Sequence, residues 1–160
     1  MNTKIPEVVL NYNYLLEIDT TPEAENPTFA NVCAGFNNLA ESLNEQIQQY
    51  FFLCGQGFAV NYITGMAPAY TLTGVRVIGD EAQDYIFGFK NKFATLTNRE
   101  SHMRLTRIAA DGSKDVISAN VTLANITDIG GGTTDGSAVG VEFRINGKPF
   151  HGDAWEELSV

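Results

Sequence analysis

The chain has 160 residues, of which 44% are hydrophobic, 11% aromatic and 18% charged, and its formal net charge is −9. This length suits one compact domain with a full core, so we expect residues 1–160 to form a single domain, and the aromatic content excludes a disordered chain. No apolar run approaches the roughly 20 residues that cross a bilayer, and an acidic chain is a poor binder of nucleic-acid phosphates.

The acidic charge is spread unevenly. Residues 1–50 carry seven acidic and one basic side chain, whereas residues 51–125 carry six acidic and seven basic ones. A solvated acidic surface explains this pattern, and a surface that must avoid holding DNA would also explain it. The N-terminal residues lack the basic-then-apolar order of a signal peptide, so we expect synthesis in the cytoplasm.

The first third of the chain predicts short strands. Residues 11–19 are aromatic and β-branched with partial alternation, which is typical of a strand, and residues 29–36 predict a second short one. Residues 37–44 are polar with scattered leucines, and we expect a helical turn or a loop there.

A β-hairpin is predicted within a projecting segment of about residues 46–68. The apolar runs 46–53 and 58–64 flank the turn sequence Cys54-Gly55-Gln56-Gly57. We hypothesise that this hairpin becomes ordered against another copy of the chain. The candidate subunit-interface residues on it are Tyr50, Phe51, Phe52, Phe58 and Tyr62.

A further strand over residues 69–78 leads into the clearest element, a helix over residues 81–92. Asp80 is placed to cap its first turn, and basic residues near its end suit the helix dipole. One apolar stripe is formed by Ala82, Tyr85, Ile86, Phe89 and Phe93. This stripe predicts a helix that lies flat on a sheet. Gly88 is the residue that weakens it.

The last third of the chain predicts three strands. Residues 101–109 and 116–126 flank the turn signal Asp111-Gly112, and residues 138–145 alternate apolar and polar side chains as a half-buried strand does. Residues 127–137 predict a flexible loop, and 146–160 a C-terminal arm. The fold class is therefore mainly β, with about seven strands: an antiparallel β-sandwich or barrel with one flanking α-helix at about 81–92.

No catalytic, cofactor-binding or metal-binding residues are predicted, so we expect that the chain is not an enzyme. The glycine-rich stretch 130–136 lacks the lysine and the following helix of a phosphate-binding loop. His102 shares a strand face with Arg104 and Thr106, without a nucleophile nearby. Acidic residues near His151, namely Asp153, Glu156 and Glu157, favour a solvated tail, with docking onto a neighbouring subunit as the alternative.

Two further features are ambiguous from sequence. Cys33 and Cys54 are isolated from each other and from histidine, which favours reduced, buried thiols over a zinc site. Their spacing neither supports nor excludes a disulfide between them. Arg76 either forms a local ion pair with Asp80 or Glu81, or contacts another subunit. Arg76 and Asp80 are therefore the remaining candidate interface residues.

The stretch from Gly74 to Tyr85, Gly-Val-Arg-Val-Ile-Gly-Asp-Glu-Ala-Gln-Asp-Tyr, resembles the strand-to-helix segment of the major tail tube proteins of siphovirus-type phages, which have long non-contractile tails, from Gram-positive bacteria. The early strand 14–18, the hairpin 49–65 and the sequence 146–149 are similar to the same family, so the resemblance covers most of the chain in order.

The resemblance implies a tail-tube-like fold in a structural virion protein that self-assembles into hexameric rings, stacked as a tail tube for DNA ejection. It implies that the chain binds copies of itself, the tape measure protein, and the tail terminator and distal tail proteins, while DNA passes through the lumen without specific binding. It also implies a place in the virion tail, without a membrane or cofactor. We hypothesise that part of the acidic excess faces the lumen and repels the DNA backbone.

Two alternatives stay open. One is the tube protein of a contractile tail, a tail-like bacteriocin or a secretion system. The other, from a different class, is a small β-barrel ligand-binding protein or enzyme, which would need a concave pocket with convergent polar groups.

Overall fold

The computed structural model describes residues 6–152, and most of them lie in antiparallel strands. The strands are β1 (Tyr14–Asp19), β2 (Phe29–Asn31), β3 (Phe36–Ser42), β4 (Gln46–Phe51), β5 (Ala59–Gly65), β6 (Ala69–Val75), β7 (Glu100–Ile108), β8 (Lys114–Thr127) and β9 (Ala138–His151). The helices are α1 (Glu81–Phe87) and α2 (Phe89–Lys92), with 3-10 turns at Asn11–Asn13, Leu53–Gly55 and Leu96–Arg99.

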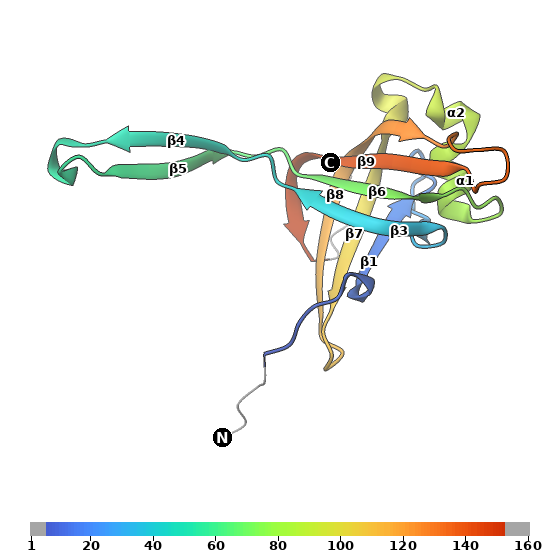
Figure 1. The fold of residues 1–160 in the computed structure, drawn as a ribbon, viewed down its shortest axis with the longest axis horizontal. Coiled ribbons are helices and arrows are strands. Elements are labelled where there is room, and N and C mark those ends of the chain that lie inside the picture. The colour runs from blue at the N-terminus through green and yellow to red at the C-terminus, as the bar shows by residue number, and fades with distance from the viewer. Residues whose placement is uncertain (1–5, 153–160) are drawn as a thin grey trace.

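Seven strands form one curled sheet in the order β2-β1-β7-β8-β9-β6-β3, so that the described part of the chain is a half-barrel with α1 and α2 at one end (Figure 1). Strands β4 and β5 pair only with each other and project from the opposite end as a long hairpin. The expected mainly β, antiparallel fold class is confirmed. The strands β2 and β3 are the two edges of the sheet.

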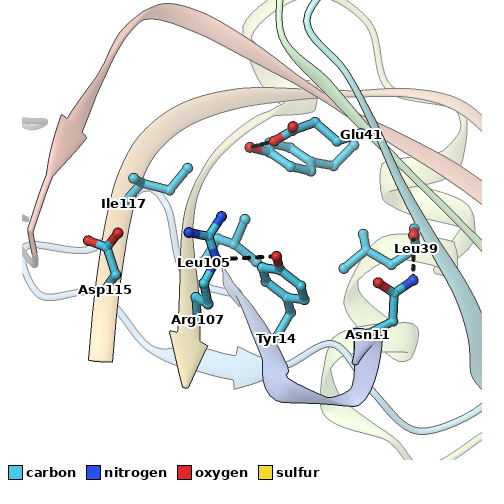
Figure 2. Close-up of a pocket in the computed structure, with 9 residues that line it drawn as sticks. Asn11, Tyr14, Leu39, Glu41, Leu105, Arg107, Asp115 and Ile117 are labelled. Atoms are coloured by element: carbon cyan, nitrogen blue, oxygen red, sulfur yellow. Dashed lines mark hydrogen bonds between the residues drawn. The ribbon is translucent and has the colours of Figure 1, made fainter. Parts of the chain in front are cut away.

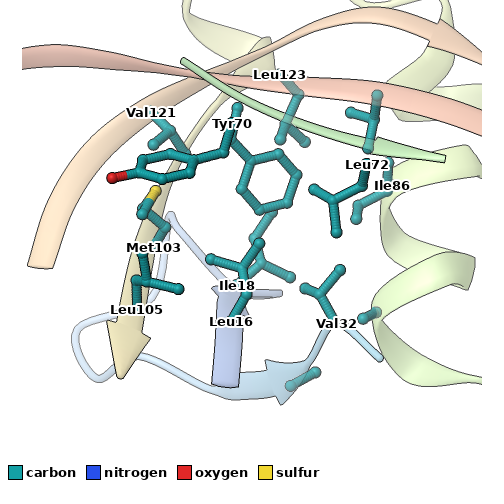
Figure 3. Packing of buried hydrophobic residues seen from close by; sticks show 14 of the residues in the cluster. Leu16, Ile18, Val32, Tyr70, Leu72, Ile86, Met103, Leu105, Val121 and Leu123 are labelled. Atoms are coloured by element: carbon teal, nitrogen blue, oxygen red, sulfur yellow. The ribbon is translucent and has the colours of Figure 1, made fainter. Parts of the chain in front are cut away.

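The core lies inside the curl of the sheet, where alternate side chains of each strand meet α1 (Figure 3). The predicted alternation of the last strand is confirmed, because Val139, Val141 and Phe143 are buried on one face of β9. From the helix, Ile86 and Phe87 are almost fully buried against this cluster. Burying side chains of this size contributes about 1.5–3 kcal/mol each, which makes this layer the main source of stability.

The single helix predicted over residues 81–92 is wrong in one respect, since it breaks at Gly88. Gly88 has an extended ψ of 140°, and the side-chain amide of Asn91 donates a hydrogen bond to the Tyr85 carbonyl at 2.5 Å. In a continuous helix, the Tyr85 carbonyl would instead accept a hydrogen bond from the backbone N–H of Phe89. The apolar stripe therefore ends at the break, and Phe89 and Phe93 are 71% and 74% exposed.

The helical turn or loop expected over residues 37–44 is also wrong, because Phe36–Ser42 form the edge strand β3. Leu39 faces Leu72 of β6, and Glu41 faces Tyr70. An edge strand with one solvated face needs few apolar residues, so its polar composition hides its extended conformation. Four other strands are shorter than predicted. Strand β1 begins at Tyr14, and the segment 29–36 contains a strand only over Phe29–Asn31. Strand β4 ends at Phe51 and β6 ends at Val75.

The C-terminal part agrees with the predicted hairpin. Strands β7 and β8 flank the Asp111-Gly112 turn, where Gly112 has a φ of +84° that favours glycine. Strand β9 continues to His151, so residues 146–151, which were expected to start an arm, belong to the sheet. The acidic residues Asp153, Glu156 and Glu157 lie outside the described residues.

Candidate self-assembly surfaces

The hairpin β4–β5 presents aromatic side chains to solvent. In its register Tyr50 lies opposite Val60, and the Tyr50 ring contacts the rings of Phe52 and Tyr62, each with centroids 5.9 Å apart. At the tip, Phe58 is 78% exposed and Leu53 is fully exposed. Residues 46–65 contain no charged side chain. Exposed apolar surface of this extent typically marks an interaction site.

Strands β4 and β5 of the hairpin pair antiparallel from Gln46 opposite Gly65 to Phe51 opposite Ala59. Gln49 donates to the side-chain oxygen of Asn61 across the strands at 3.0 Å. The tip turns through Gln56 and Gly57, which have positive φ values of 53° and 85°. No other strand pairs with β4 or β5 in the described chain. All five candidate interface residues of the hairpin are therefore exposed side chains on a free-standing two-stranded element.

The two cysteines are not buried, contrary to expectation. Cys54 lies in the tip of the hairpin and Cys33 in the connection between β2 and β3, and both are exposed and free. The reason is that neither lies on an inward-facing strand position, which a sequence alone does not reveal. Within residues 6–152 no group of histidine, cysteine and acidic residues could hold a metal ion.

Arg76 is bound within its own chain, but to partners other than those expected. Its guanidinium donates to the Val77 carbonyl at 2.7 Å and to Asp84 at 3.1 Å, and lies 3.9 Å from Asp128. It also lies over the ring of Phe87. The side chain is 16% exposed, so most of its surface is already covered by this chain.

Asp80 caps α1 as predicted. The cap binds Gln83, whose side chain has a second role that the sequence did not reveal. The Asp80 carboxylate accepts from the Gln83 backbone N–H at 3.1 Å. The fully buried Gln83 amide donates to the carbonyls of Ala34 and Val75 at 2.8 and 2.9 Å and accepts from the Val77 N–H at 2.8 Å. Gln83 therefore joins the helix to two separate segments of the sheet edge.

The solvent-facing side of the sheet carries few unbalanced charges. Glu17 pairs with Arg104, and Glu142 pairs with Arg144 at 3.2 Å. Hydrogen bonds from Asn125 and then from Arg144 lower the pKa of Glu142. Other outward positions hold small polar residues, including Asn38, Thr71, Thr73, Asn120 and Thr122. The sequence-based hypothesis is that acidic residues face the lumen. The solvent-facing side of this sheet is not acidic, so it does not supply such a surface.

A cavity of about 220 Å³ opens between β1, β7, β8 and the β3–β6 edge. Figure 2 shows Tyr14, Glu41 and Arg107 around it. The Tyr70 hydroxyl donates to Glu41 at 2.6 Å, and Arg107 donates to the Tyr14 hydroxyl at 3.2 Å. Burial, and then the Glu41 carboxylate, raise the pKa of Tyr70 far above its ordinary value. These polar groups are thus engaged with one another.

The other polar groups weighed in the sequence are also engaged in ordinary structural bonds. The imidazole Nδ1 of His102 lies 2.6 Å from the side-chain oxygen of Asn120 on the neighbouring strand. In the glycine-rich connection, Asp135 accepts from the Gly132 N–H at 2.9 Å, and the chain then enters β9. No helix within the described residues is long and apolar enough to cross a membrane.

A curled antiparallel sheet with a short helix at one end and a projecting hairpin at the other is a tail-tube-like fold. The SPP1 tail tube superposes with a TM-score of 0.63 at 8% identity, over 96% of this chain and 86% of that one. The tail of a gene transfer agent (GTA) particle gives 0.62 at 14% identity, over 91% and 99%. The tube-terminating cap of the anti-feeding prophage gives 0.60 at 11% identity, over 95% and 97%.

No protein-family model matches the sequence, and no curated protein matches it. The structural likeness therefore shows a tail-tube-like fold, and it does not distinguish a siphovirus of Gram-positive bacteria from other phage-like particles.

Proposed function

We propose that this chain is a structural virion protein that self-assembles into hexameric rings, which stack into the tail tube of a phage-like particle and conduct DNA during ejection. The observation that carries the proposal is the hairpin β4–β5. It is uncharged over residues 46–65, has exposed aromatic side chains and pairs with no other strand within residues 6–152. Such a surface is stable in water when copies of the chain cover it.

The sheet edges support the same function. In the described residues, strands β2 and β3 each have one side that pairs with no other strand, and such a side is a template for a strand of another chain. Contacts between different surfaces of identical subunits close into rings when the rotation allows, and stacked rings form an open-ended tube. Arg76 and Asp80 have mainly intramolecular roles, so the five hairpin residues remain the better interface candidates.

The solvent face of the sheet suits a conduit in which DNA is not held. Its paired charges and small polar side chains offer no concentration of arginine or lysine to bind phosphates. By the resemblance, the further partners would be the tape measure protein at the lumen, and the tail terminator and distal tail proteins at the ends. The place of the protein would be the virion tail, and it would have no enzymatic activity.

A second candidate is the tube of a contractile tail, a tail-like bacteriocin or a secretion system. It is favoured by the similarity to the anti-feeding prophage cap, and by a further match to the baseplate of the same particle with a TM-score of 0.54 at 9% identity.

Electron microscopy of the concentrated purified protein tests the proposal, because rings or tubes would be visible directly. Deleting the tip residues Gly55–Gly57 should prevent tube formation, while circular dichroism still reports a folded monomer, because the hairpin contributes nothing to the core. Phe58→Ser should weaken assembly in the same way, and Lys114→Ser, an exposed change on β8, should not. A wild-type protein that stays monomeric at high concentration would overturn the proposal.

A further inference from the structure

Helix α2 and the residues that follow it expose apolar side chains that the core does not use. These are Phe89, Phe93 and Leu96, and all three side chains are more than 70% exposed. The two phenylalanine rings pack together with centroids 6.3 Å apart. The Lys92 ammonium lies 5.8 and 5.5 Å from them. We call these three apolar residues the α2 patch.

The α2 patch is displayed by the break at Gly88. A continuous helix would direct Phe89 and Phe93 along the buried stripe, whereas the break turns them to solvent. A side chain at Gly88 would place its Cβ 2.8 Å from the Asp84 carbonyl, so the turn requires glycine. The local sequence therefore exposes two large rings at a position where continuing the helix would have buried them.

The α2 patch is also held in place by polar contacts on its inner side. Lys92 forms an ion pair with Asp128 at 2.6 Å. Arg99 donates to the Lys92 carbonyl and, at 2.8 Å, to the Leu123 carbonyl of β8. Because these contacts already fix the backbone of α2 and the following turn, covering the α2 patch costs little conformational entropy, and this favours binding.

The hairpin tip is the matching surface, and it lies at the opposite end of the molecule (Figure 1). The tip residues Leu53 and Phe58 cannot reach the α2 patch of their own chain, but they can reach that of a second copy. Residues 46–65 contain no charged side chain, so the tip can cover the α2 patch of another copy without burying an unpaired charge. Aromatic rings from the tip would add to the lysine–ring contacts already present.

We infer that in the assembled protein the hairpin tip of one copy seats on the α2 patch of the next. This inference rests on the proposed function and identifies the surface that receives the hairpin. Because tip and patch are different surfaces, each chain uses both, and the contact repeats from copy to copy.

Cross-linking tests the contact directly, because Cys54 already lies in the tip. In a Cys33→Ser background, Thr97→Cys adds a thiol beside the α2 patch without removing any of its three apolar side chains. After assembly, a short thiol-reactive cross-linker should give a ladder of covalent oligomers on a denaturing gel. The matched control, Lys114→Cys in the same background, should give no ladder beyond that of Cys54 alone.

Substitution of the α2 patch gives a second, independent measurement. Phe89→Ser combined with Phe93→Ser should raise the protein concentration needed for assembly by about tenfold or more, as expected for the loss of a central contact. The unfolding midpoint should not change, since both rings are exposed. Ile129→Ser, at a similarly exposed apolar side chain outside the patch, should leave assembly unchanged.

Tubes that form without a ladder, or a doubly substituted protein that assembles at the wild-type concentration, would overturn this inference and leave the proposed function standing. A wild-type chain that forms no rings or tubes would overturn both. Equal ladders from Thr97→Cys and Lys114→Cys would also count against the contact, since they would show unspecific association.

Discussion

Replacing Gln83 by leucine should strongly destabilise the folded protein. The side chain is fully buried, and its amide pairs with the carbonyls of Ala34 and Val75 and with the N–H of Val77. Leucine has a similar size but leaves these three backbone groups without that partner. Each unpaired group costs about 1–3 kcal/mol, so for three groups we expect a loss of about 3–9 kcal/mol from the free energy of unfolding. Typical domains have about 5–15 kcal/mol in total, so the variant should be close to unfolding.

Urea denaturation followed by far-ultraviolet circular dichroism measures this loss, at concentrations too low for assembly. Gln48→Leu is the matched control, because the Gln48 side chain is exposed on β4 and should change stability by less than about 0.5 kcal/mol. A Gln83→Leu variant within about 1 kcal/mol of wild type would refute the reasoning, because it would mean that the buried amide bonds are replaced at no cost.

Three further predictions concern the same fold. Gly74→Ala should cost more than about 3 kcal/mol in urea unfolding, because its Cβ would lie 2.0 Å from the Gly35 carbonyl oxygen, and a mild effect would contradict this close approach. Asp128→Asn should lose about 1.5–3 kcal/mol with its ion pair to Lys92, and thermal unfolding that is unchanged would contradict that estimate. The raised pKa of Tyr70 means that its stabilisation is complete below the ordinary tyrosine value of 10.0 and is lost as the pH rises above it. Relative to Tyr70→Phe, wild type should therefore lose about 1.4 kcal/mol per pH unit above that point, and parallel stability profiles of the two proteins would exclude this role.

Much of the fold could be predicted because its signals are local. The alternation in β9, the Asp111-Gly112 turn and the Asp80 cap each depend on a few neighbouring residues, and each agrees with the structure. The hairpin β4–β5 was predictable for the same reason, since two apolar runs flank a glycine-containing turn.

The failures share a different cause. Residues 36–42 form a strand because β6 lies beside them, and a polar edge strand has little signal of its own. Arg76 approaches Asp128, which lies more than 50 positions further along the chain, and no spacing rule would select that partner. The apolar spacing predicts a stripe that continues through Gly88, because the spacing does not show that the Asn91 side chain binds the Tyr85 carbonyl.

The sequence by itself determined the strand periods, the turn positions, the helix start and the uncharged aromatic hairpin, because these depend on residues that are close along the chain. The tertiary structure decided which surfaces remain uncovered. Only the folded chain buries Ile86 and Phe87 while it leaves Phe89 and Phe93 in solvent, and only the fold places the hairpin and α2 at opposite ends. Burial depends on what packs against a side chain from distant segments, and a local pattern does not contain that information.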